Sequence, residues 1–531
     1  DVVGLGKSVI ASTIARNMKL RTIVICPPHL YKQWEGYRDE FGFTASVYST
    51  GKIEDALLHY EELTKDNEQF LIIIDEAHRF RNEYTQDYAL LHNLCLGNKV
   101  LLLTATPFNN QPADIYSLVK LFQIPSRSTL KTVENFGASF KNLIDSYRDL
   151  RESQRKGEAS DDEVKAEIGH ISKSIRSIIS PLVVRRSRLD LQDIDEYAVD
   201  LVQQNIQLVI PNDPEELTYN LSELKNLYLS TLDRISKSKD SDTDGYRFKA
   251  ARYSPVLYVQ DELKDKLAKE LEYKTGVKYN LLIGRQANVA SFMRHLLVSR
   301  FESSVDAFRL SLGYMIQSSE HILSWVEKRH KIPVYKKGNL PDVTTFYEST
   351  EDGMVEIEEA FDKYEAKGFF EIDMKYINDD FVNDVKSDIE LLKNLRKQWF
   401  GEGNRIKFDP KLDSFIDIVR EKMKTDPQRK LIVFSEYADT VNYLGKALLK
   451  AGLPVMKYTS ADATPANKDS IRANFDAGLK TSLQQDDYHI LVATDAISEG
   501  YNLHRAGAIF NYDIPYNPTR VIQRIGRINR I

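Results

Sequence analysis

Short apolar runs that end in polar residues alternate with helical stretches near both ends of this chain. The early runs are "RTIVICPP", "QFLIIIDEAH" and "NKVLLLTATP", and the late runs are "RKLIVFSEY", "LPVMKYTS", "YHILVATD" and "GAIFNYDIP". Near-continuous β-branched and leucine runs are typical of strands buried on both faces. Helical stretches between such strands predict a parallel sheet covered on both sides. The sequence therefore predicts two α/β domains of the same type.

The part between these two ends has a different texture. A chain of 531 residues is too long for one hydrophobic core. We expect a first α/β lobe over residues 1–203, a mainly helical insertion over 204–403 and a second α/β lobe over 404–531. Apolar residues recur at helical spacing in "ASFMRHLLVSRFESSVDAFRLSLGYM", namely Phe292, Leu296, Val305, Phe308, Leu312 and Met315. Arg294, Arg300 and Arg309 lie among them, either as solvated residues beside a helical core or as contacts to phosphates.

The composition is ordinary for a globular protein and excludes several other classes. Hydrophobic residues make up 42% and charged residues 28% of the chain. No apolar run reaches membrane-spanning length, so we expect no membrane partner. Two cysteines, Cys26 and Cys95, offer neither a zinc spacing nor a disulfide framework and fit a reducing compartment. We expect a cytoplasmic, bacterial-type protein that is associated with the nucleoid.

Charge is segregated along the chain. The net charge is −6, but residues 350–390 carry 14 acidic and 4 basic residues, which leaves the remainder positive. Residues 501–531 carry five arginines against one aspartate. Segregated charge can guide a polyanion to one face of a protein. The acidic stretch is either a solvated face or a mask over such a basic surface.

The first eight residues, "DVVGLGKS", contain a phosphate-binding pattern in which Asp1 replaces the usual first glycine. Gly4 and Gly6 allow a tight turn whose backbone N–H groups point at an anion. Lys7 would reach the terminal phosphates, and the Ser8 hydroxyl would bind Mg²⁺. The following run, "SVIASTIARNM", predicts a helix whose positive end adds to anion binding. The expected nucleotide-binding residues here are Gly4, Leu5, Gly6, Lys7 and Ser8.

Two adjacent carboxylates follow the buried run "FLIIID". Asp75 and Glu76 stand at the carboxyl end of a predicted parallel strand, where ligands bind in open α/β sheets. Asp75 suits an Mg²⁺ ligand, and Glu76 suits the group that orients and deprotonates an attacking water. An acidic helix cap is the plainer interpretation, and the phosphate-binding pattern upstream argues against it. His78 gains interest only from its place in "DEAH".

The ordered set "DVVGLGKS", "DEAH", "TATP", "VATDAISEGYNL" and "QRIGRINR" resembles the motifs of superfamily-two helicases and translocases. "CPPHLYKQW", "DEAHRFRN", "PLVVRRSRLDL" and "NYDIPYNP" are similar to blocks of its Swi/Snf-like branch, whose loop carries an aspartate at the position of Asp1. The last blocks look most like the bacterial RNA-polymerase-associated member. The resemblance covers both α/β domains and implies two RecA-like lobes that bind ATP and Mg²⁺.

The resemblance also implies roles for individual residues. Arg527 and Arg530 lie three apart, so on a helix they share a face, and they would neutralise charge on the γ-phosphoryl group. The family pattern adds Gln523 beside that phosphate. The remaining implied residues couple the nucleotide to the lobes (Thr104, Ala105, Thr106, Asp495 and Glu499), lie near the nucleotide (Gly500) or contact nucleic acid (Pro27, Gln33, Ser435 and Thr494). Trp34 is expected to pack rather than to stack on a base.

The resemblance implies an ATP-driven translocase on double-stranded DNA. The motor motifs leave open a strand-separating DNA or RNA helicase. A third hypothesis is a remodeller of a protein–nucleic-acid complex whose helical insertion binds a protein partner. The family's adenine-recognition segment, the strand before the loop and the element after "RIGRINRI" are not in this sequence. We therefore expect the sequence to be part of a longer polypeptide.

Overall fold

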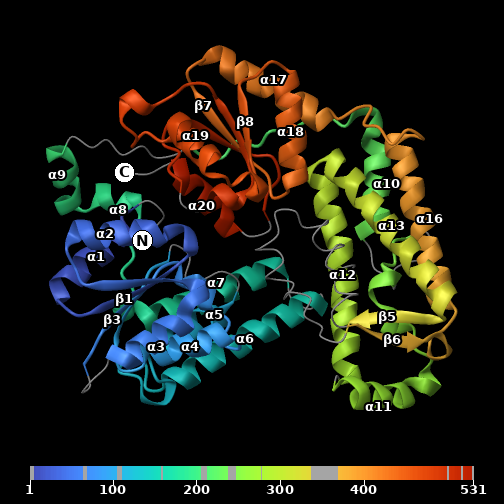
Figure 1. Cartoon of the computed structure of the whole chain (residues 1–531), viewed down its shortest axis with the longest axis horizontal. Helices are drawn as coiled ribbons and strands as arrows, with labels where there is room; N and C mark the ends of the chain where they lie inside the picture. The colour runs from blue at the N-terminus through green and yellow to red at the C-terminus, as the bar shows by residue number, and fades with distance from the viewer. Residues whose placement is uncertain are drawn as a thin grey trace. The chain divides into compact units, whose positions relative to one another are not determined.

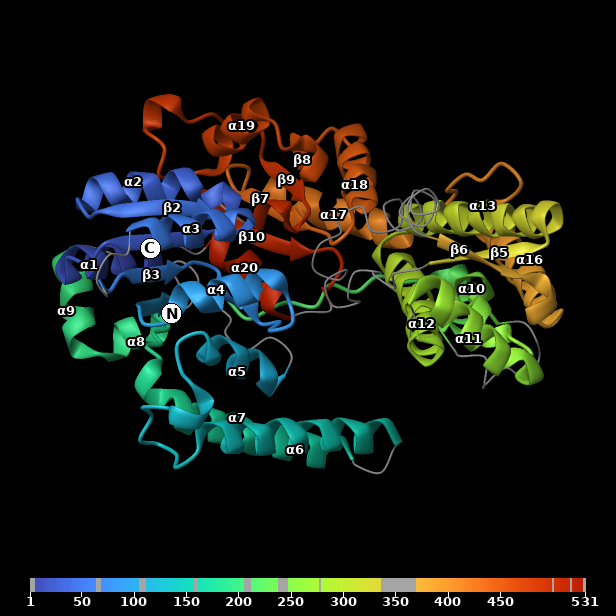
Figure 2. The same ribbon diagram turned by 60° about the horizontal axis from the view of Figure 1, so that its bottom comes forward.

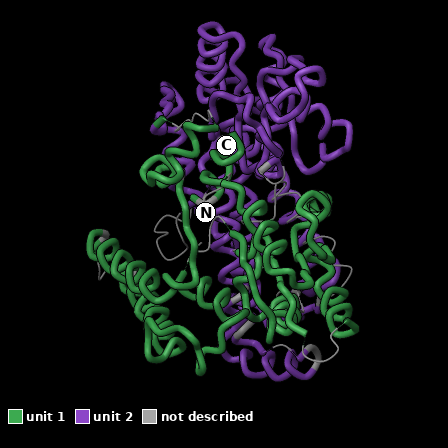
Figure 3. Tube along the Cα trace, turned by 90° about the vertical axis from the view of Figure 1, so that its left-hand side faces the viewer, with its two compact units in different colours: residues 1–212, 517–531 green, residues 213–516 purple. Residues whose placement is uncertain are grey.

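Parallel strands build two separate four-stranded sheets, as the alternating pattern predicts. The structure, a computed structural model, describes residues 5–63, 68–104, 111–156, 160–204, 212–236, 247–276, 278–335, 369–498, 501–515 and 518–528. Contacts divide the chain into two units, residues 1–212 with 517–531 and residues 213–516 (Figure 3). By these contacts the last helix belongs to the first unit. The expected boundaries of three domains stay predictions.

The first sheet has the strand order β2-β1-β3-β4, with every pair parallel. Its strands are β1 (Thr22–Cys26), β2 (Ala45–Ser49), β3 (Leu71–Ile74) and β4 (Lys99–Leu102). All residues of β1 and β3 are buried. β2 was not predicted, because it is an edge strand in which only Val47 is buried, so its sequence shows no continuous apolar run.

Helices cover both faces of this sheet (Figure 1). One face packs with α3 (Ile53–Leu63) and α4 (Gln86–Cys95) through residues such as Ile72 and Leu91. The other packs with α1 (Lys7–Met18) and α2 (Tyr31–Phe41) through residues such as Ile73. Because both faces are apolar and covered, the polar side chains of the sheet are confined to the ends of its strands.

The rest of the first unit is helical. Its helices are α5 (Pro112–Lys120), α6 (Phe136–Lys156), α7 (Asp161–Ile179), α8 (Arg188–Asp193), α9 (Asp195–Gln203) and α20 (Pro518–Ile528). α6 and α7 lie side by side (Figure 2) and share a core that includes Phe140 and Ile175. The sequence pattern placed the long helices after residue 204, so this pair begins about 70 residues earlier than expected.

The second sheet has the strand order β10-β7-β9-β8, again entirely parallel. Its strands are β7 (Lys430–Phe434), β8 (Val455–Tyr458), β9 (Ile490–Ala493) and β10 (Ala506–Asn511), and its helices are α17 (Pro410–Thr425), α18 (Ala438–Lys450) and α19 (Pro465–Phe475). α17 and α18 pack on one face through residues such as Phe415 and Leu444. All four predicted strands of this domain are confirmed.

The helical middle region belongs to the same unit as the second sheet. It consists of α10 (Lys225–Ser236), α11 (Lys264–Thr275), α12 (Tyr279–Ser303), α13 (Val305–Arg329) and α16 (Asp380–Phe400), with an antiparallel hairpin of β5 (Lys331–Tyr335) and β6 (Phe369–Asp373). The run from 290 to 315 bends at Ser304, whose hydroxyl accepts a hydrogen bond from the first turn of α13. Phe292, Leu296, Phe308, Leu312 and Met315 are buried, as predicted, whereas Val305 is only half-buried.

The arginines of this region are not simply solvated. Arg300 has 0% exposure, so the expectation of a solvated or phosphate-facing residue is wrong for it. Arg294 donates to the carbonyl of Lys249, and Arg309 pairs with Asp306. Residues 336–368, which hold much of the acidic stretch, lie outside the described residues. In the part of the chain that the structure describes, no helix is long and apolar enough to cross a membrane.

Candidate ATP site

The phosphate-binding pattern lies at the start of α1, as predicted. Gly6 has a φ of 72°, a left-handed conformation that favours glycine, and its carbonyl accepts the first helical bond, from the N–H of Ile10 at 2.9 Å. Lys7 and Ser8 are half-buried in the first turn, which contains no acidic residue. The partial positive charge of this helix end is therefore not neutralised from within the helix. Gly4 lies outside the described residues, and Leu5 is half-buried.

Asp75 directly follows β3 and is 5% exposed. Its Oδ1 accepts a hydrogen bond from the backbone N–H of Glu76 at 2.9 Å, and its Oδ2 accepts one from Nε1 of Trp34, also at 2.9 Å. Burial, followed by the negative charge of Glu76, raises the pKa of Asp75 to about 6. Trp34 packs at 1% exposure, as expected, but its bond to Asp75 was not predicted. The two donors fix the orientation of the carboxylate.

Glu76 occupies a left-handed conformation, with a φ of 48°, which is unfavourable for a residue with a side chain. Its Oε2 lies 3.3 Å from Nδ1 of His78, and the same nitrogen lies 3.4 Å from the hydroxyl of Thr104. Burial alone would raise the pKa of Glu76, but the neighbouring His78, with the charges of Lys7 and Arg527, lowers it. Glu76 is thus kept ionised, as a base must be.

Arg527 lies on α20, is 8% exposed and is close enough to Glu76 for its charge to act on that carboxylate. Gln523 on the same helix is half-buried, and Arg530 lies outside the described residues. Arg524 is fully buried and was not predicted. Its spacing of three from Arg527 puts it on the same helix face, which is a signal that the sequence contained.

The structure therefore brings Lys7, Asp75, Glu76 and Arg527 together within one unit. Two cationic side chains near one buried and one half-buried carboxylate suit a triphosphate that carries several negative charges. Their predicted roles in catalysis stay predictions.

The donors at this site have the chemistry that Mg²⁺ requires. Mg²⁺ is bound by hard oxygen ligands, commonly one or two from the protein with the rest from phosphates and water. Asp75 offers a buried carboxylate oriented by its two hydrogen bonds, and Ser8 offers a half-buried hydroxyl. Among the described residues no cluster of three or more His, Cys, Asp or Glu side chains forms a metal cage. A cation held jointly with phosphates fits this donor set.

The predicted coupling residues are described only in part. Thr104 is half-buried after β4 and is linked to Glu76 through His78. Asp495 is half-buried in a short 3-10 helix after β9, in the second unit. Ala105, Thr106, Glu499 and Gly500 lie outside the described residues.

The four residues expected to contact nucleic acid have different environments. Gln33 is exposed, and its side chain donates to the hydroxyl of Tyr37 at 2.7 Å. Pro27 is buried directly after β1. Ser435 and Thr494 each have 0% exposure. A direct phosphate contact needs exposed atoms, so this arrangement gives the last two assignments no support, and they stay predictions.

Two protein-family models match the chain. The SNF2-related domain matches residues 3–244, and the helicase conserved C-terminal domain matches residues 410–531. These ranges contain the first and the second parallel sheet respectively. All residues of the candidate site fall inside them.

One relative aligns with the whole of this chain and others align with parts of it, in agreement with these matches. The uncharacterized ATP-dependent helicase YqhH of Bacillus subtilis (strain 168) is 21% identical over 552 residues, which covers 100% of this chain and 69% of that protein. DNA repair protein RAD5 of Debaryomyces hansenii is 29% identical over 189 residues, or 35% of this chain and 13% of its own length. The probable ATP-dependent RNA helicase DDX28 of Mus musculus is 28% identical over 24% of this chain and 22% of its own length.

Two solved structures align with nearly the whole chain at low similarity. The Hef helicase domain of Pyrococcus furiosus has a TM-score of 0.35 and 16% identity, covering 99% of this chain and 88% of that structure. The SWI2/SNF2 ATPase core of Sulfolobus solfataricus in complex with double-stranded DNA has a TM-score of 0.29 and 14% identity, covering 100% and 81%. At these TM-scores neither structure supports a statement about the site or its ligands.

Proposed function

We propose that this chain, whose matches to the SNF2-related domain and to the helicase conserved C-terminal domain indicate an ATP-dependent enzyme, is an ATP-driven translocase on double-stranded DNA. One observation carries the proposed chemistry. Glu76 is a half-buried, ionised carboxylate whose pKa is lowered by His78, Lys7 and Arg527. A base with two phosphate-binding cations beside it is the arrangement that triphosphate hydrolysis needs.

Each residue of the site has a separate task in this proposal. Lys7 and the N-terminus of α1 hold the terminal phosphates, and Arg527 neutralises the charge that develops on the γ-phosphoryl group. Glu76 accepts a proton from the attacking water. Ser8 and Asp75 would hold Mg²⁺, which when bound supplies further neutralisation of the phosphates. Arg530 and Gln523 are proposed to assist Arg527.

The choice of double-stranded DNA rests on the Swi/Snf-like blocks of the sequence and on the basic character of residues 501–531. Motion along a phosphate backbone requires no reading of bases, so we expect no sequence preference. Binding should weaken steeply with salt, because phosphate contacts release counterions.

The test compares ATP hydrolysis with duplex DNA, single-stranded DNA and RNA at one fixed salt concentration. We expect the largest stimulation with duplex DNA, together with displacement of a third strand from a triplex and no separation of a simple duplex. Lys7→Ala should lose hydrolysis with every nucleic acid. Equal stimulation by all three nucleic acids, or unwinding without triplex displacement, would overturn the choice of a duplex translocase.

A strand-separating DNA or RNA helicase is the second candidate, favoured by the partial match to the RNA helicase DDX28. Single-stranded nucleic acid or RNA would then be the best stimulator in the same assay. A remodeller of the RNA-polymerase-associated type, which binds a protein through the helical middle region, is the third candidate. Co-elution of the full chain with purified bacterial RNA polymerase tests it, and separate elution at micromolar concentrations would argue against it.

A further inference from the structure

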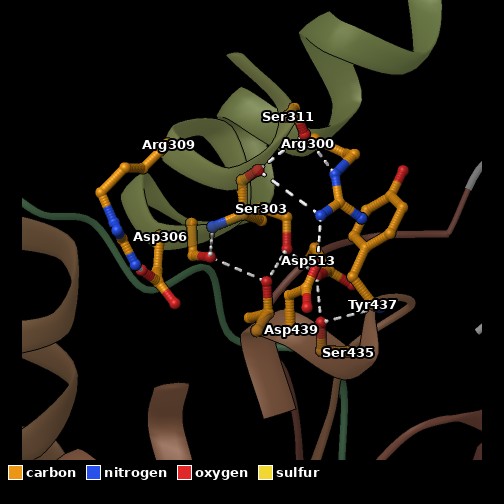
Figure 4. A network of polar contacts seen from close by, with 12 residues as sticks. Arg300, Ser303, Asp306, Arg309, Ser311, Ser435, Tyr437, Asp439 and Asp513 are labelled. Atoms are coloured by element: carbon orange, nitrogen blue, oxygen red, sulfur yellow. Dashed lines mark hydrogen bonds and ion pairs between the residues drawn. The ribbon is translucent and has the colours of Figure 1, made fainter. Parts of the chain in front are cut away.

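Side chains of the second sheet domain form hydrogen bonds and an ion pair with the corner between α12 and α13 (Figure 4). α12 ends at Ser303 and α13 begins at Val305, so the corner presents the carbonyl end of one helix and the N-terminus of the next. Both helix ends need external partners for their backbone or capping groups. The partners lie on α17, on α18 and in the segment after β10, more than 100 residues further along the chain.

Two residues of the second sheet domain form hydrogen bonds directly with carbonyl and hydroxyl groups of the corner. Lys411 of α17 donates to the carbonyls of Glu302 and Ser303 at 2.8 and 2.9 Å, where a positive charge favours a helix C-terminus. The hydroxyl of Thr440 lies 2.8 Å from the hydroxyls of both Ser303 and Ser304. Ser303, Ser304 and Thr440 are all buried, so each lost hydrogen bond would leave an unsatisfied polar group.

Asp513 is the centre of a second set of contacts. Its Oδ2 accepts hydrogen bonds of 2.5 Å from the hydroxyls of Ser303 and Ser435, and its Oδ1 accepts one of 2.8 Å from the backbone N–H of Glu436. Ser435 and Glu436 follow β7, and Asp513 follows β10, its neighbour in the sheet. One carboxylate therefore joins the ends of two adjacent strands to the corner of the helical region.

Arg300 and Asp439 form an ion pair next to the same corner. The Arg300 side chain is completely buried, and its Nη2 pairs with Asp439 in the first turn of α18. Nε of Arg300 also donates to Ser311 at 2.5 Å, and its guanidinium lies 5.1 Å from the ring centre of Tyr437. A buried arginine is costly to leave without its carboxylate, so the pair strongly favours this one arrangement of helix and sheet.

We propose that these contacts, the hydrogen bonds of Ser303 with Thr440 and Asp513 and the Arg300–Asp439 ion pair, form a joint that makes the helical middle region and the second sheet domain one rigid body. Asp513 would be a positioning residue for the chain that continues toward α20. Asp513 precedes Pro518, the first residue of α20, by five positions, and α20 carries Arg527. A change at the Ser303–Asp513 hydrogen bond would therefore act on the chain that continues from β10 toward Arg527. The part of this inference that concerns coupling to Arg527 rests on the proposed function, whereas the rigid body does not.

Distance measurements between two spin labels test the rigid body without any assumption about function. Asn394 on α16 and Leu449 on α18 are exposed and lie on opposite sides of the joint, and Cys26 and Cys95 are buried. We expect one narrow distance distribution that is the same with and without a non-hydrolysable ATP analogue. A broad distribution, or one that shifts with nucleotide, would overturn the rigid body.

A joint variant, Ser303→Ala with Asp439→Asn, removes the hydrogen bond from Ser303 to Asp513 and weakens the ion pair between Arg300 and Asp439. Its matched control is Ser318→Ala with Asp417→Asn, since the Ser318 hydroxyl donates to the carbonyl of Met315 in its own helix and Asp417 is 78% exposed. The joint variant should broaden the distances, and the control should not. If the joint variant does not fold, Ser303→Ala alone removes the hydrogen bond to Asp513 and should broaden the distance distribution less. Equal widths in variant and control would refute the joint.

The coupling itself is measured as triplex displacement per ATP hydrolysed, a ratio that does not depend on the fraction of active protein. We expect the joint variant to hydrolyse ATP within about twofold of the control and to lose several-fold in displacement per ATP. An unchanged ratio would overturn the role of Asp513 in coupling. A wild-type protein that hydrolyses ATP but moves no DNA would instead refute the proposed function, and the distance measurement would still decide on the joint.

Discussion

The indole Nε1 of Trp34 donates a 2.9 Å hydrogen bond to Oδ2 of Asp75, across 41 residues of sequence and inside the core of the first unit. The bond joins α2 to the end of β3, on the face of the sheet that also packs with α1. The other carboxylate oxygen of Asp75, Oδ1, accepts a hydrogen bond from the backbone N–H of Glu76. The packing of one aromatic side chain thereby sets the direction of a proposed Mg²⁺ ligand.

Trp34→Phe keeps the ring and removes this donor. A hydrogen bond to a charged acceptor contributes about 1.5–3 kcal/mol, so we expect kcat/KM for ATP to fall about tenfold or more. The Trp34 bond lowers the pKa of Asp75, whereas burial and the charge of Glu76 raise it. Without that bond the pKa of Asp75 rises and the carboxylate is protonated at a higher pH, so the loss of activity should be larger at lower pH. The control is Trp399→Phe, which removes a similar 2.9 Å bond, to Thr231, in the helical region. Equal losses in both variants would contradict a specific role for Trp34.

His78→Ala should shift the pH dependence of hydrolysis. Burial would raise the pKa of Glu76, and His78 is the strongest influence that lowers it. Without His78 the pKa of Glu76 rises, so Glu76 becomes protonated at a higher pH as the solution is acidified. We expect the acid limb of the kcat profile to move to higher pH. His170→Ala, at an exposed position on α7, is the control. An acid limb that stays in place would contradict the role of His78.

Arg527→Ala tests the arginine helix. A positioned arginine at the γ-phosphoryl group is worth about a thousandfold or more in rate, so kcat should fall by that order, with a smaller change in nucleotide affinity. The control is Arg16→Ala, at an exposed arginine in the last turn of α1. Steady-state hydrolysis and binding of a fluorescent nucleotide measure the two effects. A loss of less than tenfold in kcat would contradict the proposed contact.

Asp388 makes stability depend on pH. Burial raises its pKa to about 7, although the backbone N–H groups of Ala251 and Lys249 lower it, and Asp384 raises it further. The folded state therefore holds a proton that the unfolded chain releases near pH 4, so this contribution to stability is lost as pH rises from about 4 to 7. We expect the difference in thermal midpoint between wild type and Asp388→Asn to be larger at pH 5 than at pH 8. Exposed Asp413→Asn should show no such difference. A constant difference for Asp388→Asn would contradict this assignment.

Much of the fold followed from the sequence because parallel strands buried on both faces must be apolar throughout. The central strands β1 and β3 of the first sheet and β7 and β9 of the second have this pattern. The edge strand β2 does not, since its side chains are mostly half-exposed. The positions of Lys7, Asp75 and Glu76 were equally predictable, because a helix start and a strand end are local features.

Contacts between distant segments could not be predicted in this way. Helical spacing places Arg300 beside a core, but its partner Asp439 is 139 residues away, on a helix of the second sheet domain. The same limit applies to Trp34, whose apolar ring explains its burial and whose N–H finds Asp75 only in the folded chain. Buried polar groups need partners, but a single sequence does not say which.

The most direct test of the ATP site is the turnover of Glu76→Gln measured together with its nucleotide affinity. The substitution removes the base and keeps the size of the side chain. We predict that hydrolysis falls by about a hundredfold to ten-thousandfold, the range for loss of a general base, while ATP binding stays within a few-fold of wild type. Full turnover in Glu76→Gln, at unchanged affinity and fold, would contradict the site proposed for this chain.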